Sequence, residues 1–178
     1  HAFFRASTVA AQIVNFDYMK YLYGVNPYTV RFKGTLESLV PQEVKDTMTT
    51  ITLCGRLCGN DINYLAHCAE QLNLKTIDMG EAKIVEGPGQ YNDEYSYTTT
   101  NDIISTRMFE DFNIEEVILP KSATTIDALA FNQNTKIKNV VIGENTTSIG
   151  DKAFYKCTAL ENITISASVK EIGMQNHA

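Results

Sequence analysis

Histidine and clustered basic residues are the most informative shortages in this chain. Of its three histidines, His1 and His177 lie at the ends of the sequence, so a histidine-dependent catalytic arrangement would depend on His67 alone. The 15 Lys and Arg residues are outnumbered by 21 Asp and Glu residues and form no cluster, which argues against a nucleic-acid partner. No apolar run approaches the roughly 20 residues that span a bilayer, so no transmembrane segment is expected.

Motifs that would position an acid and a base, or hold a phosphate, are missing as well. Glu115 and Glu116 are adjacent, and adjacent residues of a strand face opposite sides. Asp93 and Glu94 form a similar pair, without the alternating acidic pattern of a calcium loop. Gly87–Gly89 is not followed by the Lys and Ser or Thr of a phosphate-binding loop. The sequence therefore predicts a protein that is not an enzyme and has no cofactor.

The four cysteines do not have the spacing of a metal site. Cys54 and Cys58 could form half of a zinc site, but no second pair of Cys or His follows at a suitable distance. His67 and Cys68 are neighbours, and on a helix they would point about 100° apart. Buried free thiols are favoured for the first three cysteines, with a disulfide from Cys68 to Cys54 or Cys58 as the alternative. Cys157 is expected to pack in the core.

The N-terminal region, residues 1–27, admits two interpretations. In the first, Ser7 caps a helix that ends near Gly24. Its apolar side would hold Val9, Ile13, Phe16 and Tyr23. In the second, the region is a decayed repeat, because Ala2–Val9 matches Ala153–Leu160 position by position. The chain has no initiator Met and no clear leader cleavage site, so a processed or trimmed chain is expected.

A repeated pattern organises the rest of the chain. A frame of the form apolar-x-x-apolar-x-apolar occurs five times, and its last three copies are 23 residues apart. The frames are Met48-Ile51-Leu53, Leu74-Ile77-Met79, Ile114-Val117-Leu119, Ile137-Val140-Ile142 and Leu160-Ile163-Ile165. Two further apolar series follow the same period: Phe109, Phe131 and Phe154, and Ile126, Ile149 and Ile172. Such a period predicts a solenoid, in which short parallel strands stack at about 4.8 Å and bury one face.

The frames and the residues between them resemble a known family. Leu119–Ile126 and Ile149–Leu160 are similar to the BspA-like leucine-rich repeat, whose consensus reads roughly LPxSVTSIGxxAFxxCxxLxxIxI. The resemblance extends over Ile103–Gly173. It implies an α/β repeat protein: a leucine-rich-repeat-like, right-handed solenoid of short parallel strands with an N-terminal α/β cap.

The chain departs from the family pattern at four positions. Asp127 and Ala128 replace the usual residues after the conserved isoleucine position, and Phe112 and Asn134 stand where the family has Cys. All four positions belong to the repeat framework. We therefore expect these differences to change details of the core and to leave the architecture intact.

The sequence divides into further regions after residue 27. Residues 28–80 are expected to form the cap and irregular first repeats, including a strand at 30–32, a helix start at 41–45 and a helix opened by Asp61. The apolar face of that last helix would hold Ile62, Leu65, Ala69 and Leu72. Residues 81–101 lengthen the interval between frames to 40 residues and predict a Tyr-rich insert loop. Residues 102–178 carry the regular repeats of 22–23 residues.

Two surfaces are candidates for binding. The outward side chains of the strands should form two columns, because alternate residues of a strand share one face. The first column is Thr50, Thr76, Glu116, Asn139 and Asn162, and the second is Thr52, Asp78, Ile118, Val141 and Thr164. The insert adds Tyr91, Tyr95 and Tyr97 as exposed aromatic candidates. The alternatives are a sheet face that is merely solvated and tyrosines that only pack their own loop.

The resemblance implies a bacterial protein that is secreted or lies at the outer cell surface. It predicts a non-enzymatic binding or adhesion module that recognises a host or matrix protein or a glycan through the exposed repeat face. The alternatives are a structural spacer that displays another domain and, disfavoured by the missing acid and base, a glycan-acting hydrolase. Self-association through the C-terminal strand edge is a further expectation.

Overall fold

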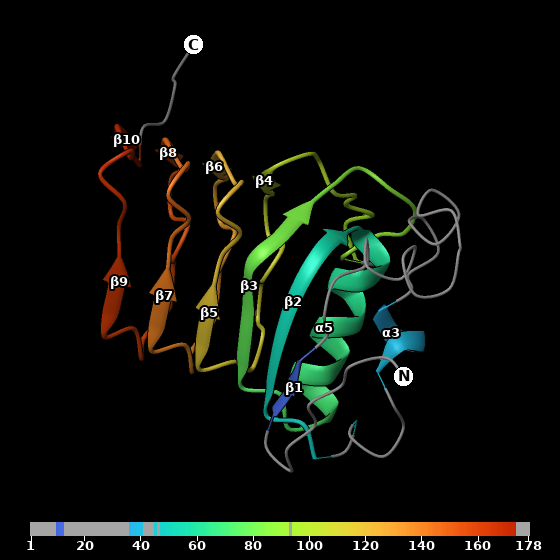
Figure 1. Ribbon diagram of the computed structural model, residues 1–178. Coiled ribbons are helices and arrows are strands. Elements are labelled where there is room, and N and C mark those ends of the chain that lie inside the picture. The colour runs from blue at the N-terminus through green and yellow to red at the C-terminus, as the bar shows by residue number, and fades with distance from the viewer. Residues whose placement is uncertain (1–9, 13–35, 41–44, 46, 93, 174–178) are drawn as a thin grey trace.

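Two parallel sheets run side by side along an elongated stack of coils (Figure 1). The computed structural model describes residues 10–12, 36–40, 45, 47–92 and 94–173. The larger sheet has the order β1-β2-β3-β5-β7-β9, and the smaller has the order β10-β8-β6-β4. The larger sheet comprises β1 (Ala10–Gln12), β2 (Thr50–Leu57), β3 (Thr76–Ile84), β5 (Glu116–Ile118), β7 (Asn139–Val141) and β9 (Asn162–Thr164). The smaller comprises β4 (Ile103–Ile104), β6 (Thr125–Ile126), β8 (Ser148–Ile149) and β10 (Glu171–Ile172).

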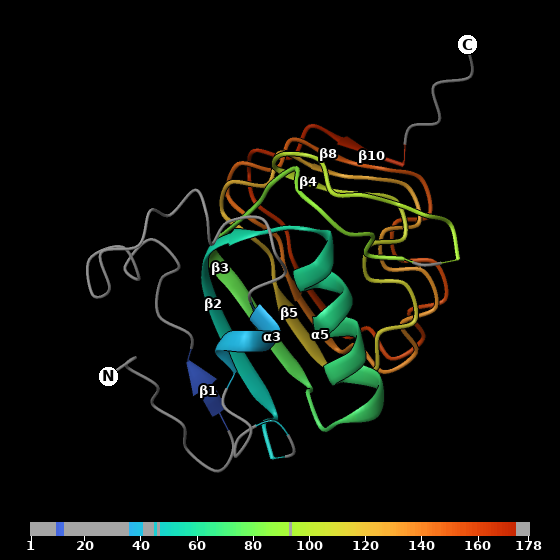
Figure 2. The same cartoon turned by 90° about the vertical axis from the view of Figure 1, so that its right-hand side faces the viewer.

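The coils stack in the register that the repeat predicts. Val117 pairs with Val140, and Val140 pairs with Ile163, each step being 23 residues. The pairings of β2, β3, β5, β7 and β9 also place every member of the two predicted outward columns beside the next. Figure 2 looks along the stack and shows the coils superposed on one another. The predicted α/β repeat solenoid with parallel strands is therefore confirmed.

Apolar side chains of successive coils fill the space between the two sheets. The first four frames are buried, with relative exposures of 0–4% for their twelve residues. Phe109, Phe131 and Phe154 form a stack of rings, whose neighbouring centroids are 5.1 Å apart in both pairs. Each of these three coils thus contributes one ring to the stack and one set of aliphatic residues, which are buried against the neighbouring coils.

Exposure rises at the last described coil. Ile142 and Ile149 are each only 4% exposed, whereas their counterparts one coil later, Ile165 and Ile172, are 47% and 61% exposed. The difference arises because these two positions have a neighbouring coil on one side only in the described part of the chain. Self-association through this edge stays a prediction.

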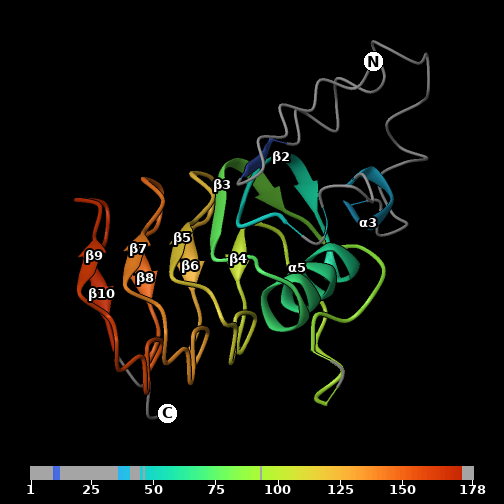
Figure 3. The same ribbon diagram turned by 90° about the horizontal axis from the view of Figure 1, so that it is seen from below.

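Two helices of the described residues border the first strands. Helix α3 (Leu36–Leu39) contacts helix α5 (Gly59–Gln71), which lies beside β2 and β3 at one end of the stack (Figure 3). The predicted helix is confirmed, with Ile62, Leu65 and Ala69 buried. It begins at Gly59, two residues before the expected position. Cys58 is its N-cap, and Asp61 occupies the third helical position, where its carboxylate caps the helix from within.

Two predictions about irregular regions need correction. Ala10–Gln12 forms strand β1, so the helical one of the two interpretations of residues 1–27 is wrong at these three residues. The rest of 1–27, the strand predicted at 30–32 and residues 41–44 lie outside the described residues. Residues 81–84, predicted as loop, continue β3 and pair with Cys54–Leu57 of β2 after a register shift. The Gly and Pro residues that suggested a loop begin only at Gly87, so they did not exclude a longer strand.

The departure at Asn134 has a structural reason. Its side-chain amide is fully buried and donates hydrogen bonds to the backbone carbonyls of Phe109 and, at 3.1 Å, Phe131. One coil later the Cys157 thiol donates to the Phe131 carbonyl at 3.1 Å. The two side chains therefore perform the same task, which is to satisfy a carbonyl that the turn leaves inside the core.

We expect Asn134→Ala to lower the free energy of unfolding by about 2 kcal/mol, because it leaves the buried Phe109 carbonyl without the donor that Asn134 supplies. Asn134→Cys should stay within about 1 kcal/mol of the parent, since a thiol at this position reaches the carbonyl and removes the Asn134 Oδ1 atom, which has no partner among the described residues. Urea unfolding of both variants measures the difference. Equal losses in the two variants would contradict the assigned donor role.

Candidate functional site

The insert between the cap and the first regular coil is a packed loop closed at its base. Asp102 N–H donates to the Ile84 carbonyl at 3.0 Å, and Thr99 Oγ1 donates to the Val85 carbonyl at 2.7 Å. The Asn101 side-chain oxygen accepts from Glu86 N–H at 2.9 Å. These bonds join the two ends of the loop, so the additional residues leave and rejoin the stack at one place.

Tyr91 fastens this loop to the first coil. Its side chain is only 5% exposed, and its hydroxyl donates to the Thr106 carbonyl at 2.8 Å. Its N–H donates to the Tyr97 carbonyl at 2.9 Å. Burial raises the pKa of Tyr91, so the phenol remains a donor at neutral pH. The prediction that Tyr91 is exposed is therefore wrong, because the ring packs the loop against the first coil.

Tyr95 and Tyr97 stay nearer the surface. Their rings stack with centroids 5.5 Å apart, and Tyr95 is 41% exposed, whereas Tyr97 is half-buried. The guanidinium of Arg107 lies 4.9 Å from the Tyr95 ring centroid and pairs with Glu110. Tyr95 is thus the most exposed of the three predicted tyrosines. Its side chain is held in place by contacts with Tyr97 and Arg107.

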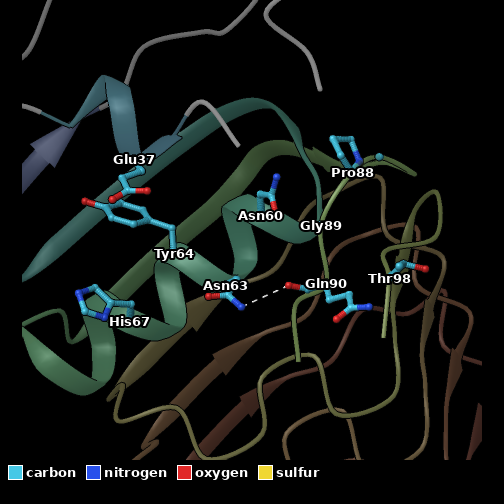
Figure 4. Close-up of a pocket in the computed structure, with 10 residues that line it drawn as sticks. Glu37, Asn60, Asn63, Tyr64, His67, Pro88, Gly89, Gln90 and Thr98 are labelled. Atoms are coloured by element: carbon cyan, nitrogen blue, oxygen red, sulfur yellow. Dashed lines mark hydrogen bonds between the residues drawn. The ribbon is translucent and has the colours of Figure 1, made fainter. Parts of the chain in front are cut away.

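A polar groove lies between α5 and the insert loop (Figure 4). Gly59 and Gly89 allow the walls to meet at one end, since a Cβ on Gly59 would lie 2.0 Å from the Gly89 carbonyl oxygen. Asn63 Nδ2 donates to the Gln90 carbonyl at 3.3 Å across the walls. The hollow has a volume of about 960 Å³ and is lined by Glu37, Asn60, Asn63, Tyr64, His67, Gly87, Pro88, Gly89, Gln90 and Thr98.

A second hollow of about 310 Å³ shares Asn63 and His67 with the first. It extends the groove along α5 to Glu70 and along the other wall to Arg107 and Glu110. Sequence reasoning missed this site. The only available signal was that residues 60, 63, 64 and 67 share one face of the predicted helix, which by itself does not show what lies opposite.

The six candidate residues of the sheet face lie side by side on β5, β7 and β9. Glu116, Ile118, Asn139 and Val141 are half-buried, and Asn162 and Thr164 are exposed. Asn162 Nδ2 donates to Asn139 Oδ1 at 2.9 Å, so a side-chain hydrogen bond also joins these two coils. The structure therefore brings these six residues together and places Tyr95 and Tyr97 in a separate loop.

Charges of alternating sign stack beside this face. Residues Lys75, Glu115, Lys138 and Glu161 follow one another in successive coils through backbone hydrogen bonds. The Lys138 ammonium lies 2.7 Å from the Glu115 carboxylate, and its hydrogen bond lowers the pKa of Glu115. Lys121 forms a similar ion pair with Glu81, which also joins two coils. The border of the face is thus charged but largely neutralised.

The cysteines are free thiols, and three of them have raised pKa values. Burial raises the pKa of Cys58 to about 11 and that of Cys157 to about 11, and burial also raises the pKa of Cys68. Cys58 Sγ donates to Asp61 at 3.3 Å. Thiols with such pKa values are not nucleophiles at neutral pH. Within the described ranges no group of three or more His, Cys, Asp or Glu residues could hold a metal ion.

Asp127, one of the departures from the repeat pattern, has a pKa raised by burial, and the Thr106 N–H partly opposes this shift. A raised pKa means that the folded state favours the protonated carboxyl, so stability increases as pH falls through the folded pKa towards the unfolded value of about 3.9. We expect Asp127→Asn to be more stable than the parent at pH 7, with the difference vanishing near pH 4.

Thermal unfolding across pH 4–8 measures this difference, and Asp111→Asn, at an exposed position, controls for the loss of one negative charge. A stabilisation by Asp127→Asn that is independent of pH would contradict the assigned cause.

Comparison with protein families gives a match over the repeats. A family model described as the BspA type leucine rich repeat region matches residues 93–177 in six copies. No curated protein matches the chain. A search of the described residues finds no helix that is both long and apolar enough to cross a membrane.

Proposed function

We propose that the chain is a binding module that holds an extended protein segment on the outward face of β5, β7 and β9. The proposal is supported by the match of residues 93–177 to the family model of the BspA type leucine rich repeat region. The family is generally non-enzymatic, is typically found on the cell surface or secreted, and is consistent with a protein-binding role. We further propose that this chain acts outside a bacterial cell, as an adhesion module for a host or matrix protein.

The observation that carries this proposal is the continuous pair of outward columns. Glu116, Asn139 and Asn162 offer carboxylate and amide groups, and Ile118 and Val141 offer small apolar surface beside them. An extended peptide that runs along the stack presents backbone amide groups and alternating side chains, so it can contact both columns over several coils. The neutralised charges along the border permit approach by partners of either sign.

We expect the double substitution Val141→Lys and Thr164→Lys to weaken partner binding at least roughly tenfold, because two buried ammonium groups would oppose the docked segment. The measurement is surface plasmon resonance with a panel of purified extracellular-matrix proteins. The matched control is Thr135→Lys with Thr158→Lys, which also changes two residues 23 positions apart but at exposed sites outside the strands.

Equal binding by the two double variants would exclude the sheet face. If no matrix protein bound the parent, the result would favour the spacer role. Tyr95→Ala tests the remaining insert candidate separately, because Tyr95 is exposed and its removal leaves the Tyr91 anchor in place.

A further inference from the structure

We propose that the groove between α5 and the insert loop is a second binding site, which takes a short neutral oligosaccharide. This groove is distinct from the sheet face, and the proposal does not depend on the function proposed above. It is formed by one stripe of α5 and by the loop that runs opposite, at Gly87–Asn92. Its larger part has a volume of about 960 Å³, at the upper end of the range for small-molecule sites.

The two walls are held in place without a ligand. At one end the Asn60 N–H donates to the Pro88 carbonyl at 3.3 Å, and Gly89 has φ +89°, a conformation that favours glycine. At the other end Tyr91 anchors the loop to the Thr106 carbonyl. A loop fastened at both ends loses little conformational entropy when a ligand binds, which favours affinity for a small ligand.

The lining favours hydroxyl groups as ligands. Asn60, Asn63 and Gln90 carry side-chain amides, which both donate and accept hydrogen bonds, and Thr98 adds a hydroxyl. Sugar hydroxyls also donate and accept hydrogen bonds, so a side-chain amide or hydroxyl can form hydrogen bonds with each of them. His67 is exposed at the junction of the two hollows and adds another hydrogen-bonding group in the middle of the groove.

The charges of the groove argue against an acidic ligand. Among the described residues that line the two hollows, Arg107 is the only Lys or Arg, and its guanidinium is paired with Glu110. Glu37 lines the larger hollow and Glu70 lines the smaller one, and both add negative charge. A phosphate or sulfate group would therefore meet carboxylates and a neutralised cation, which is unfavourable. Of the ten residues that line the larger hollow, only Tyr64 and Pro88 have apolar or aromatic side chains, so a hydrophobic ligand is disfavoured there too.

The test is isothermal titration calorimetry, in which the parent protein is titrated with short neutral oligosaccharides of glucose, mannose, galactose or N-acetylglucosamine. The blocking variant combines His67→Met with Thr98→Met, which removes hydrogen-bonding groups from both walls and adds bulk. The matched control combines Gln71→Met with Thr100→Met, which are exposed neighbours on the same helix and loop but do not line the groove. Circular dichroism and thermal unfolding verify that both variants are folded.

We expect at least one oligosaccharide to bind, with affinity reduced roughly tenfold or more in the blocking variant and unchanged in the control. Two results would overturn the proposal: no oligosaccharide binding by the parent, or equal binding by both variants. Loss of sugar binding in the Val141→Lys and Thr164→Lys variant, with normal binding in the groove variant, would assign the sugar to the sheet face and also overturn it.

Discussion

Phe131→Ala should lower the free energy of unfolding by about 3–5 kcal/mol, the largest effect expected from a single change in the repeats. The ring is fully buried and stacks between two others, with interplanar angles of 12° to Phe109 and 16° to Phe154. Its removal leaves a cavity that neither neighbour can fill, because their rings are held one coil away on either side. Loss of the two ring contacts adds to the cost of the cavity.

The measurement is urea unfolding combined with hydrogen exchange. Because coils interact only with their neighbours, exchange should accelerate most in the coils of Phe131 and Phe154 and least in β2 and α5. Phe131→Leu should retain part of the stability, and Lys136→Ala, an exposed change in the same coil, should stay within about 0.5 kcal/mol of the parent. A loss below about 1 kcal/mol for Phe131→Ala would show that the stack does not support the solenoid.

Asp61→Ala should destabilise the cap by about 2–5 kcal/mol. The Asp61 carboxylate is 2% exposed and accepts hydrogen bonds from the N–H groups of Leu36 and Cys58, at 3.1 and 2.9 Å, and from the Cys58 thiol. Alanine would leave both buried N–H groups without their acceptor, and each such loss costs about 1–3 kcal/mol. Because Leu36 belongs to α3, the same change should release α3 from α5.

Cys58→Ala provides the matched comparison, since it removes the thiol bond and keeps both backbone bonds. We expect it to cost about 1 kcal/mol, with Asp61→Asn between the two because the amide keeps one oxygen as acceptor. Thermal unfolding of the three variants, followed by far-ultraviolet circular dichroism of the helices, gives the order. Equal losses for Asp61→Ala and Cys58→Ala would mean that the carboxylate does not join the two helices.

Residue periodicity was sufficient to predict the repeats, and the reason is visible at particular positions. Val117, Val140 and Ile163 lie one above another because each coil buries the same face and the stack repeats at a constant spacing. The helix of the cap was also predictable, since Ile62, Leu65 and Ala69 recur at helical spacing. The Asn134 site was visible only as a departure from a family pattern. Its carbonyl partners became apparent in the structure.

Some residues of the candidate sites could likewise be predicted from their spacing, and others could not. Glu116, Asn139 and Asn162 could be assigned to one outward column from the sequence, because a strand repeats its facing every two residues. Tyr91 could not be distinguished from Tyr95 in this way. The insert has no periodicity, and whether each ring is buried depends on where the loop meets the first coil.

The sequence by itself determined the architecture of this protein, because its recurring apolar residues can all be buried only by stacking coils in one register. Only the tertiary structure decided the groove beside α5. Its walls come from residues about 30 positions apart along the chain, such as Asn60 and Gln90, and they meet through a close approach of Gly59 to Gly89 that no local pattern encodes. Contacts between non-repeating segments depend on three-dimensional packing, so local residue spacing carries no record of them.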